Sequence, residues 1–159
     1  MLNLKAVLYP TDFSECSLAA LPYAVGLAQQ NHAELHCMHV VDVPHEQHLT
    51  SEYMVPMEMP HVPKDKLLRT ARVRLDRFIT ESLSGIDEVT SRLVLGDPFA
   101  EIIRCAEDHE IDLIVLGTHG RSAVASILLG SVAEKVVSRA PCPVLTVRHP
   151  EYKFEMPCV

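Results

Sequence analysis

The chain has 159 residues, of which 48% are apolar and 22% are charged, and its formal net charge is −7. This length suffices for one domain that buries a core without disulfides or metal ions, and the composition is that of an ordinary globular protein. The acidic balance argues against a general nucleic-acid-binding protein, which needs a basic face. No apolar run approaches the roughly 20 residues of a membrane-spanning helix, so we expect no membrane partner.

Cysteine usage and the first residues of the chain indicate a reducing compartment. The five cysteines are an odd number without C-x-x-C spacing, unlike a disulfide framework or a zinc site. Cys37 and Cys105 lie in apolar patterns typical of a core, whereas Cys158 near the end is the one candidate for a reactive thiol. Residues 1–5 lack the basic segment of a signal peptide. We therefore expect a cytoplasmic protein.

The first half of the chain predicts strand, helix, strand and helix. A short apolar run at 6–9 predicts the first strand, and Ser14 can cap a helix whose apolar residues recur at helical spacing. Pro22 lies inside this helix and should kink or locally perturb it. Residues 34–43 predict the second strand, and apolar positions between 67 and 79 predict the second helix.

The second half continues the alternation. Residues 89–95 predict a third strand, after which Asp97 can cap a helix with Pro98 at its first position. The run 111–116 has no polar residue after Asp112, as a strand buried on both faces requires. The remaining predicted elements are a helix at 130–140 and a strand at 143–147.

Strands that alternate with helices, without hairpin turns, predict an α/β fold: a five-stranded parallel sheet with helices on both faces, Rossmann-like, in a single domain. We expect this domain to span residues 1–150, followed by a tail at 151–159. A proline-rich stretch at about 43–63 predicts a long loop within the domain.

One motif joins the fourth strand to the last helix. Gly117-Thr118-His119-Gly120-Arg121 follows the strand, and nine residues separate Gly120 from Gly130-Ser131. Glycines allow the turn and a close approach of the backbone to a ligand, while backbone N–H groups at a helix start can converge on phosphate oxygens. Arg121 adds a cation and Ser131 a hydroxyl. The motif therefore predicts a site for nucleotide phosphates.

Two further segments reach the same edge of the predicted sheet. Residues 10–12 follow the first strand and Val40-Val41 end the second, as Gly117 ends the fourth. In open parallel sheets, ligands bind at the carboxyl ends of the strands, where the strand order reverses. We therefore expect these segments to line one site.

The chain resembles the universal stress protein family. Its glycine loop matches that family's G-2x-G-9x-G-(S/T) pattern through Gly117, Gly120, Gly130 and Ser131. Three more segments resemble the family's first loop, second-strand ending and last-strand entry: 9–14, 38–42 and 141–145. The likeness covers nearly the whole chain, and the combination is far more specific than any single motif.

The resemblance implies the family's ATP-binding branch, because every position of the glycine pattern is present. The expected ligand is ATP, with ADP or AMP as alternatives, and Mg²⁺ is a candidate companion ion. By correspondence, Asp12 and the Val40 backbone hold the adenosine end, and Pro10 and Thr11 shape that pocket. The ribose and phosphates are expected to contact Gly117, His119, Gly120 and Arg121. The end of the phosphate tail is expected to contact Gly130, Ser131 and Val132.

The resemblance also implies a homodimer that pairs through the last strand, 144–147. The apolar, β-branched character of this strand favours pairing at an open edge. A protein partner is expected for a regulatory protein, but the sequence does not identify one.

Structural alternatives stand beside these assignments. Asp12 can brace the first turn, Arg121 can be an ordinary surface arginine, and His119 fits loop shaping better than general-base catalysis. His36 and His39 are expected to be structural and not metal ligands, because neighbouring strand residues point to opposite faces and cannot converge on one ion. The histidines and methionines of the 43–63 loop match no familiar metal spacing, so no metal site is predicted.

Three functional hypotheses remain. The chain lacks the P-loop, dinucleotide and esterase motifs, and no acidic pair for magnesium is evident. We therefore predict no catalytic residues and favour a nucleotide-binding stress-response regulator with little or no hydrolysis. The alternatives are a slow ATP hydrolase and a structural dimer with a vestigial pocket.

Overall fold

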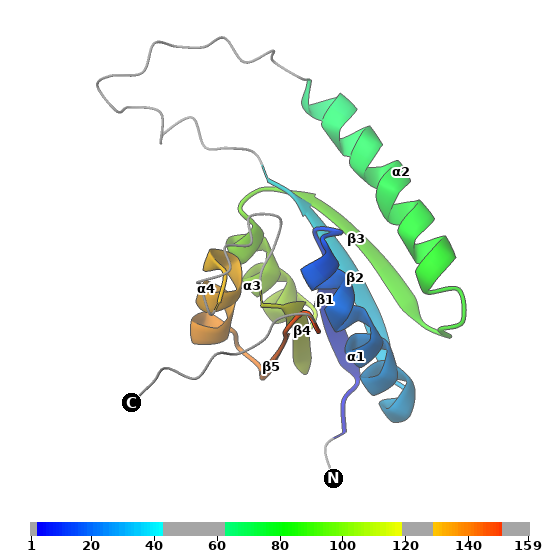
Figure 1. Ribbon diagram of the computed structural model, residues 1–159, viewed down its shortest axis with the longest axis vertical. Coiled ribbons are helices and arrows are strands. Elements are labelled where there is room, and N and C mark those ends of the chain that lie inside the picture. Colours follow the sequence, from blue (N-terminus) through cyan, green and yellow to red (C-terminus); the bar gives the residue numbers. More distant parts are fainter. Residues whose placement is uncertain (1–2, 43–62, 119–128, 151–159) are drawn as a thin grey trace.

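Strands and helices alternate along the chain in the computed structural model, which describes residues 3–42, 63–118 and 129–150. Figure 1 shows a central sheet with helices packed against it. The strands are β1 (Ala6–Pro10), β2 (Glu34–Val41), β3 (Val89–Leu95), β4 (Leu113–Gly117) and β5 (Val144–Val147). The helices are α1 (Glu15–Asn31), α2 (Lys64–Ser82), α3 (Pro98–Asp108) and α4 (Ser131–Arg139).

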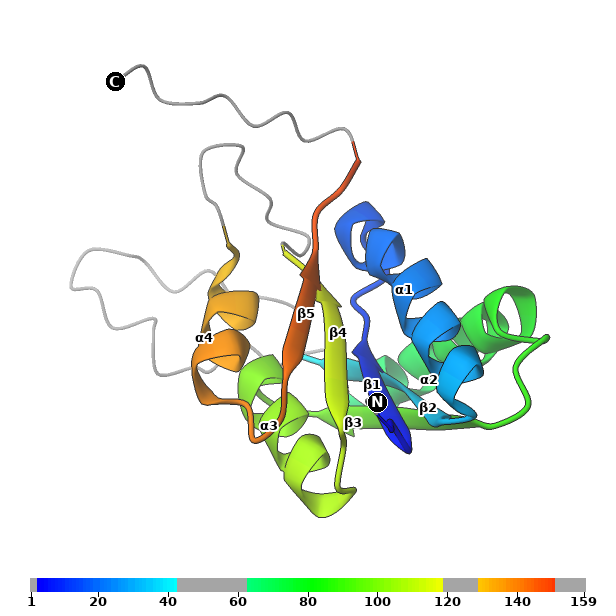
Figure 2. The ribbon, with the colours of Figure 1, turned by 90° about the horizontal axis from the view of Figure 1, so that it is seen from below.

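All five strands are parallel, in the order β3-β2-β1-β4-β5. This confirms the predicted fold class. The chain first winds from β1 outward to β3, and then returns to β4 and winds the other way. With right-handed crossovers, α1 and α2 cover one face and α3 and α4 the other, as Figures 1 and 2 show. The winding reverses between β1 and β4.

The core forms two layers because side chains alternate along each strand. Leu35 and Cys37 of β2 belong to the layer under α1 and α2, whereas Met38 belongs to the layer under α3 and α4. Cys37 and Cys105 are buried, as expected, and burial raises the pKa of the Cys37 thiol to about 12. All cysteines in the described ranges are free thiols.

Helix α1 has its predicted cap and is not ended by Pro22. The Ser14 hydroxyl accepts a hydrogen bond from Ser17 N at 3.2 Å, as an N-cap residue should. Pro22 lies within the helix, yet α1 is continuous from Glu15 to Asn31. Pro22 sits on the exposed side, where the carbonyl that loses its helical partner can turn to water.

Several strand boundaries differ from the sequence prediction, most of all the start of β4 and the end of β2. Strand β4 begins at Leu113, not at residue 111, because the Asp112 carboxylate binds the backbone N–H groups of Lys5 and Ala6 at 2.7 and 3.0 Å. Strand β2 ends at Val41, whose carbonyl accepts from Gly96 N just beyond β3. The 43–63 loop, apart from residue 63, and the 151–159 tail lie outside the described residues.

Gly117 is required for packing. A Cβ at this position would lie 2.4 Å from the carbonyl oxygen of Cys16 and 3.0 Å from Ser17 N. No described glycine has positive φ, so the expected role in the turn is replaced by a steric one. The end of β4 and the first turn of α1 approach each other so closely that only glycine fits.

The Gly117→Ala variant should therefore lose stability, by about 2–3 kcal/mol, because the added methyl overlaps backbone atoms that cannot move alone. The matched variant is Gly26→Ala inside α1, where a Cβ meets nothing within 4 Å. It should gain about 0.5–1 kcal/mol from helix propensity. Urea denaturation of both variants measures the two effects, and a Gly117→Ala protein as stable as wild type would contradict this account of the packing.

Candidate functional site

The carboxyl ends of β1 and β4 lie at the point where the strand order reverses. The chain leaves β1 with Thr11 N donating to Met38 O at 2.8 Å, and leaves β4 with Thr118 N donating to Val147 O at 2.9 Å. The segment after β1 leads to α1 on one face, and the segment after β4 leads to α4 on the other. Such a divergence leaves a crevice where ligands of open α/β sheets bind.

The loop between β1 and α1 is held by its own polar side chains. Asp12 Oδ1 accepts from the backbone N–H of Ser14 at 3.0 Å and from its hydroxyl at 2.6 Å. Thr11 Oγ1 accepts from Phe13 N at 3.0 Å. The structural alternative for Asp12 is thus realised, since one of its oxygens braces the turn. This bracing also fixes the position of the carboxylate at the strand end.

A buried network anchors the same loop from below. Thr11 is 5% exposed, and its hydroxyl lies 3.0 Å from that of Ser17. The Tyr9 hydroxyl donates to Ser17 O at 2.9 Å. Burial raises the pKa of Tyr9, so its hydroxyl remains a donor at neutral pH. Thr11 therefore shapes the site from within the protein, while Pro10 beside it is half-buried.

Helix α4 begins directly beside the end of β4. Gly130 is its N-cap residue, and Gly130 N donates to Thr118 O at 2.7 Å. Among the described residues, no side chain caps the helix. The N–H groups of its first turn, which begins at Ser131, carry the positive end of the helix dipole. This is the geometry that binds phosphate at helix starts.

The remaining predicted residues divide into two groups. Val40 is half-buried near the end of β2, and Val132 packs against the core under α4. His119, Gly120 and Arg121 lie outside the described residues. The described site therefore joins the ends of β1, β2 and β4 to the start of α4, and the contribution of the glycine loop itself stays a prediction.

Phe13 was not among the site residues predicted from the sequence, yet its conformation is unusual. Its φ is 62°, in the left-handed region that bulky residues avoid. Its ring lies 4.6 Å from that of His39, whose Nδ1 lies 2.7 Å from Thr11 O. No local sequence signal marks a phenylalanine for this conformation, because asparagine and glycine are its usual occupants. His39 is structural, as expected.

Among the described ranges, no cluster of three or more histidine, cysteine, aspartate or glutamate side chains could hold a metal ion. The histidines and methionines between residues 43 and 62 lie outside those ranges.

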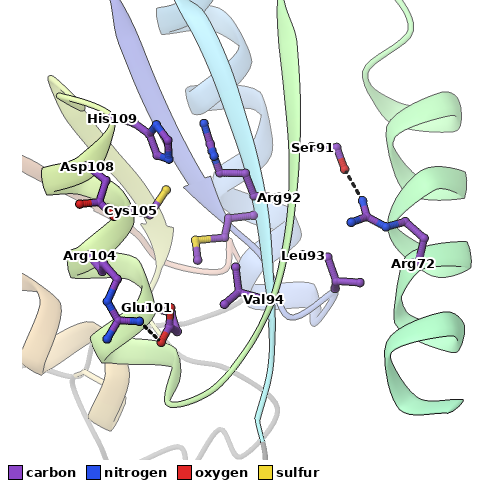
Figure 3. A pocket seen from close by; sticks show the side chains of 11 residues that line it. Arg72, Ser91, Arg92, Leu93, Val94, Glu101, Arg104, Cys105, Asp108 and His109 are labelled. Atoms are coloured by element: carbon purple, nitrogen blue, oxygen red, sulfur yellow. Dashed lines mark hydrogen bonds and ion pairs between the residues drawn. The ribbon is translucent and has the colours of Figure 1, made fainter. Parts of the chain in front are cut away.

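A hollow lies at the outer edge of the sheet, away from the carboxyl ends of β1 and β4. It has a volume of about 310 Å³ and lies between β3 and α3 (Figure 3). Arg92 of β3 and His109 after α3 face each other across it. The Arg104–Glu101 ion pair, 2.5 Å long, stands at its other end. Mixed charge and distance from the strand-order reversal set this hollow apart from the expected ligand site.

A buried histidine supports the wall of this hollow. Arg92 Nε donates to His36 Nδ1 at 3.0 Å, and His36 Nε2 lies 3.2 Å from Glu34 Oε2. His36 is 3% exposed, and burial lowers its pKa more than the neighbouring Glu34 raises it. His36 is therefore neutral in the fold, with Nδ1 free of a proton to accept from Arg92.

This arrangement predicts that acid weakens the fold. An unfolded histidine has a pKa of about 6.5. Just below that pH the unfolded chain therefore binds a proton at residue 36, whereas folded His36, whose pKa is lower, stays neutral. The stability contributed by His36 is complete above about pH 6.5 and falls as the pH drops toward the lower folded pKa. Urea midpoints at about pH 7.5 and about pH 5.5 measure the loss.

The His36→Gln variant should lose less stability than wild type over this interval, because glutamine does not titrate. The exposed His32 has φ 52°, so His32→Asn is a control that keeps the left-handed conformation. Identical pH dependence in wild type and His36→Gln would show that His36 does not control it.

Comparison with known proteins gives a consistent relationship. The model of the Universal stress protein family matches residues 3–148. Universal stress protein MJ0577 of Methanocaldococcus jannaschii is 31% identical over 91% of this chain and 94% of its own. The solved structure of MJ0577 aligns with a TM-score of 0.74 over 92% of this chain and 97% of that one, at 34% identity.

Two other solved structures of universal stress proteins also align with this chain. Universal stress protein UspA from Lactobacillus plantarum has a TM-score of 0.74 and 30% identity over 93% of this chain and 100% of its own. A universal stress protein in complex with cAMP has a TM-score of 0.58 and 25% identity, covering 93% of this chain and 99% of that one. Of the helices in the described ranges, none is both long and apolar enough to cross a membrane.

Proposed function

The chain belongs to the universal stress protein family, and we propose that it binds ATP, with ADP or AMP as alternative ligands, in the crevice between the ends of β1 and β4. One observation carries the proposal: the start of α4, with glycine at its N-cap, is joined to the end of β4 by the 2.7 Å bond from Gly130 N to Thr118 O. The related protein in complex with cAMP supports an adenine nucleotide as the ligand class.

The two sides of the crevice suit different parts of a nucleotide. The α4 side offers backbone N–H groups from Gly130, Ser131 and Val132, which suit phosphate oxygens. On the other side, Asp12 is a carboxylate and would repel phosphates, so it belongs beside sugar hydroxyls or an exocyclic amine. The adenosine end then lies between Asp12 and the Val40 backbone.

Local donors can bind a polyanion to this acidic protein. The net charge of −7 repels ATP at long range, but repulsion between exposed charges is screened beyond about 10 Å in ordinary salt. Hydrogen bonds to phosphate act at contact distance and are strengthened by charge. In this proposal Arg121 and Gly120 of the glycine loop complete the phosphate contacts, and Mg²⁺ accompanies the nucleotide.

We assign the nucleotide a regulatory role in the cytoplasm, in a stress-response protein, with little or no hydrolysis. Phosphoryl transfer needs a group that orients the nucleophile and a metal site near the γ-phosphate, and the motif supplies neither of them. A slow hydrolase and a vestigial pocket remain the alternatives. Calorimetry with ATP, followed by phosphate release with Mg²⁺, separates the three functions.

The Gly130→Val variant should abolish ATP binding and leave the fold intact. Gly130 has φ −69° and ψ 158°, an extended conformation that valine favours, so the backbone can keep its course. The branched side chain would occupy the space that phosphate must approach. Calorimetry measures the affinity, and circular dichroism checks the fold.

The control is Gly85→Val, in the loop before β3, where a Cβ meets nothing within 4 Å. Its affinity for ATP should equal that of wild type. Wild-type affinity in Gly130→Val as well would remove the phosphate assignment, and the absence of ATP binding in wild type would favour the vestigial pocket.

We also propose a homodimer formed through residues 144–147. The carbonyls of Pro143 and Val147 accept hydrogen bonds from the β4 side. Backbone groups alternate sides along a strand, so those of Val144 and Thr146 point to the outer edge. Among the described residues β5 pairs with β4 alone. This edge can therefore accept a second copy of the chain.

The Thr146→Pro variant should shift the protein from dimer to monomer. Proline removes the N–H group that faces the open edge, while the bonds from β5 to β4 use the alternate residues. Light scattering at micromolar concentration measures the mass, and thermal unfolding checks the fold. A wild-type monomer, or a folded Thr146→Pro dimer, would contradict pairing through this strand.

A further inference from the structure

Phe13 occupies a strained position in the proposed nucleotide loop. It directly follows Asp12, and its φ of 62° is costly for a residue with a bulky side chain. Strain of this kind persists only where surrounding contacts hold it, and it is concentrated at functional sites. The contacts that hold Phe13 therefore help to determine the conformation of the loop.

Those contacts come largely from α2. The Arg74 guanidinium lies over the Phe13 ring, 4.5 Å from its centre. The Phe78 ring meets Phe13 edge-on at 5.5 Å, and it also stacks with Tyr9 at 6.4 Å. Arg74 thus contacts the β1–α1 loop, although its own position on the helix is exposed.

Helix α2 packs against the sheet along one face. Leu75 is its one buried residue, Phe78 and Ile79 are partly buried against the same core, and Figure 1 shows the helix on the outside of the sheet. Val73 is 65% exposed. The cluster of Phe13, Arg74 and Phe78 is therefore one part of what positions the helix.

We infer that Phe13 is a positioning residue that couples the β1–α1 loop to α2, so that nucleotide binding and the docking of α2 stabilise each other. The inference rests on the proposed function and adds a means of regulation to the same site. Contacts from α2 hold Phe13 in the left-handed conformation. This conformation preserves the hydrogen bonds from Phe13 N to Thr11 Oγ1 and from Ser14 N to Asp12 Oδ1. That is the form of the loop that places the Asp12 carboxylate in the crevice.

The coupling must act in both directions. If loss of the α2 contacts lets the loop leave this form, the apparent affinity for ATP falls in proportion to the remaining competent fraction. By linkage, bound ATP must then favour docked α2 to the same extent. A substitution in α2, on the outside of the molecule, would thus change the ATP affinity of a site that it does not touch.

The chain offers a matched pair of variants on one helix. Arg74→Gln removes the cation over Phe13. Arg77→Gln makes the same change at an exposed arginine whose ion pair is with Glu81, at 4.0 Å. Both variants remove one positive charge from α2, but Arg74→Gln also removes a contact with Phe13 that Arg77→Gln leaves in place.

The first measurement needs no nucleotide. Amide hydrogen exchange, read by NMR, should be faster at Phe13 and Ser14 in Arg74→Gln by about two- to five-fold, the range expected for loss of an exposed cation–π contact. Arg77→Gln should exchange as wild type does. Equal exchange in the two variants would overturn the coupling.

The second measurement uses ATP. Its affinity should be lower in Arg74→Gln than in wild type, by at most about five-fold, and stay unchanged in Arg77→Gln. In a Phe13→Leu background, which lacks the aromatic face, Arg74→Gln should have no further effect, because the contact is already lost. Additive effects of the two changes would overturn the inference.

In wild type, ATP should also slow amide exchange in α2, and no change in that helix would refute the coupling. The outcomes separate the two proposals. A wild-type protein that binds no adenine nucleotide ends the proposed function and the regulation with it. ATP binding with unaltered loop exchange in Arg74→Gln ends this inference alone.

Discussion

The architecture depends on the contact between the end of β4 and the first turn of α1. Gly117 brings the strand so close to the Cys16 carbonyl that no side chain fits between them. Since α1 lies on one face of the sheet and β4 leads to α4 on the other, this contact fixes the edge at which the winding reverses. Thr118 follows immediately and receives the start of α4 through Gly130 N. Packing and site geometry therefore rest on the same few backbone atoms.

The fold was predictable because its signals are local and repeated. The apolar run that becomes β4, the Ser14 cap and the Asp97 cap each act within a few residues. The errors came from tertiary contacts. Asp112 binds backbone N–H groups more than 100 residues away in sequence, and β4 begins after it, at Leu113.

The geometry of the candidate site was predictable at the strand ends, and unpredictable where side chains meet across elements. The convergence of residues 10–12 with Gly117 and Gly130 follows from parallel topology alone. The conformation of Phe13 does not, because it depends on Arg74 and Phe78, some 60 residues further along the chain. Bracing of the loop by Asp12 was one of the interpretations that the sequence left open, and the hydrogen bonds to Ser14 show that it occurs.

The proposed nucleotide would link the two layers of the protein. Its adenosine end would lie beside Asp12, in the loop that Phe13 connects to α2. Its phosphates would lie at the start of α4, which leads into β5 and the edge proposed for dimer formation. The two ends of one ligand would then bear on two separate surfaces, α2 and β5, on opposite sides of the reversal point. Binding without turnover suffices for such a role, because the ligand acts by stabilising one arrangement of both surfaces.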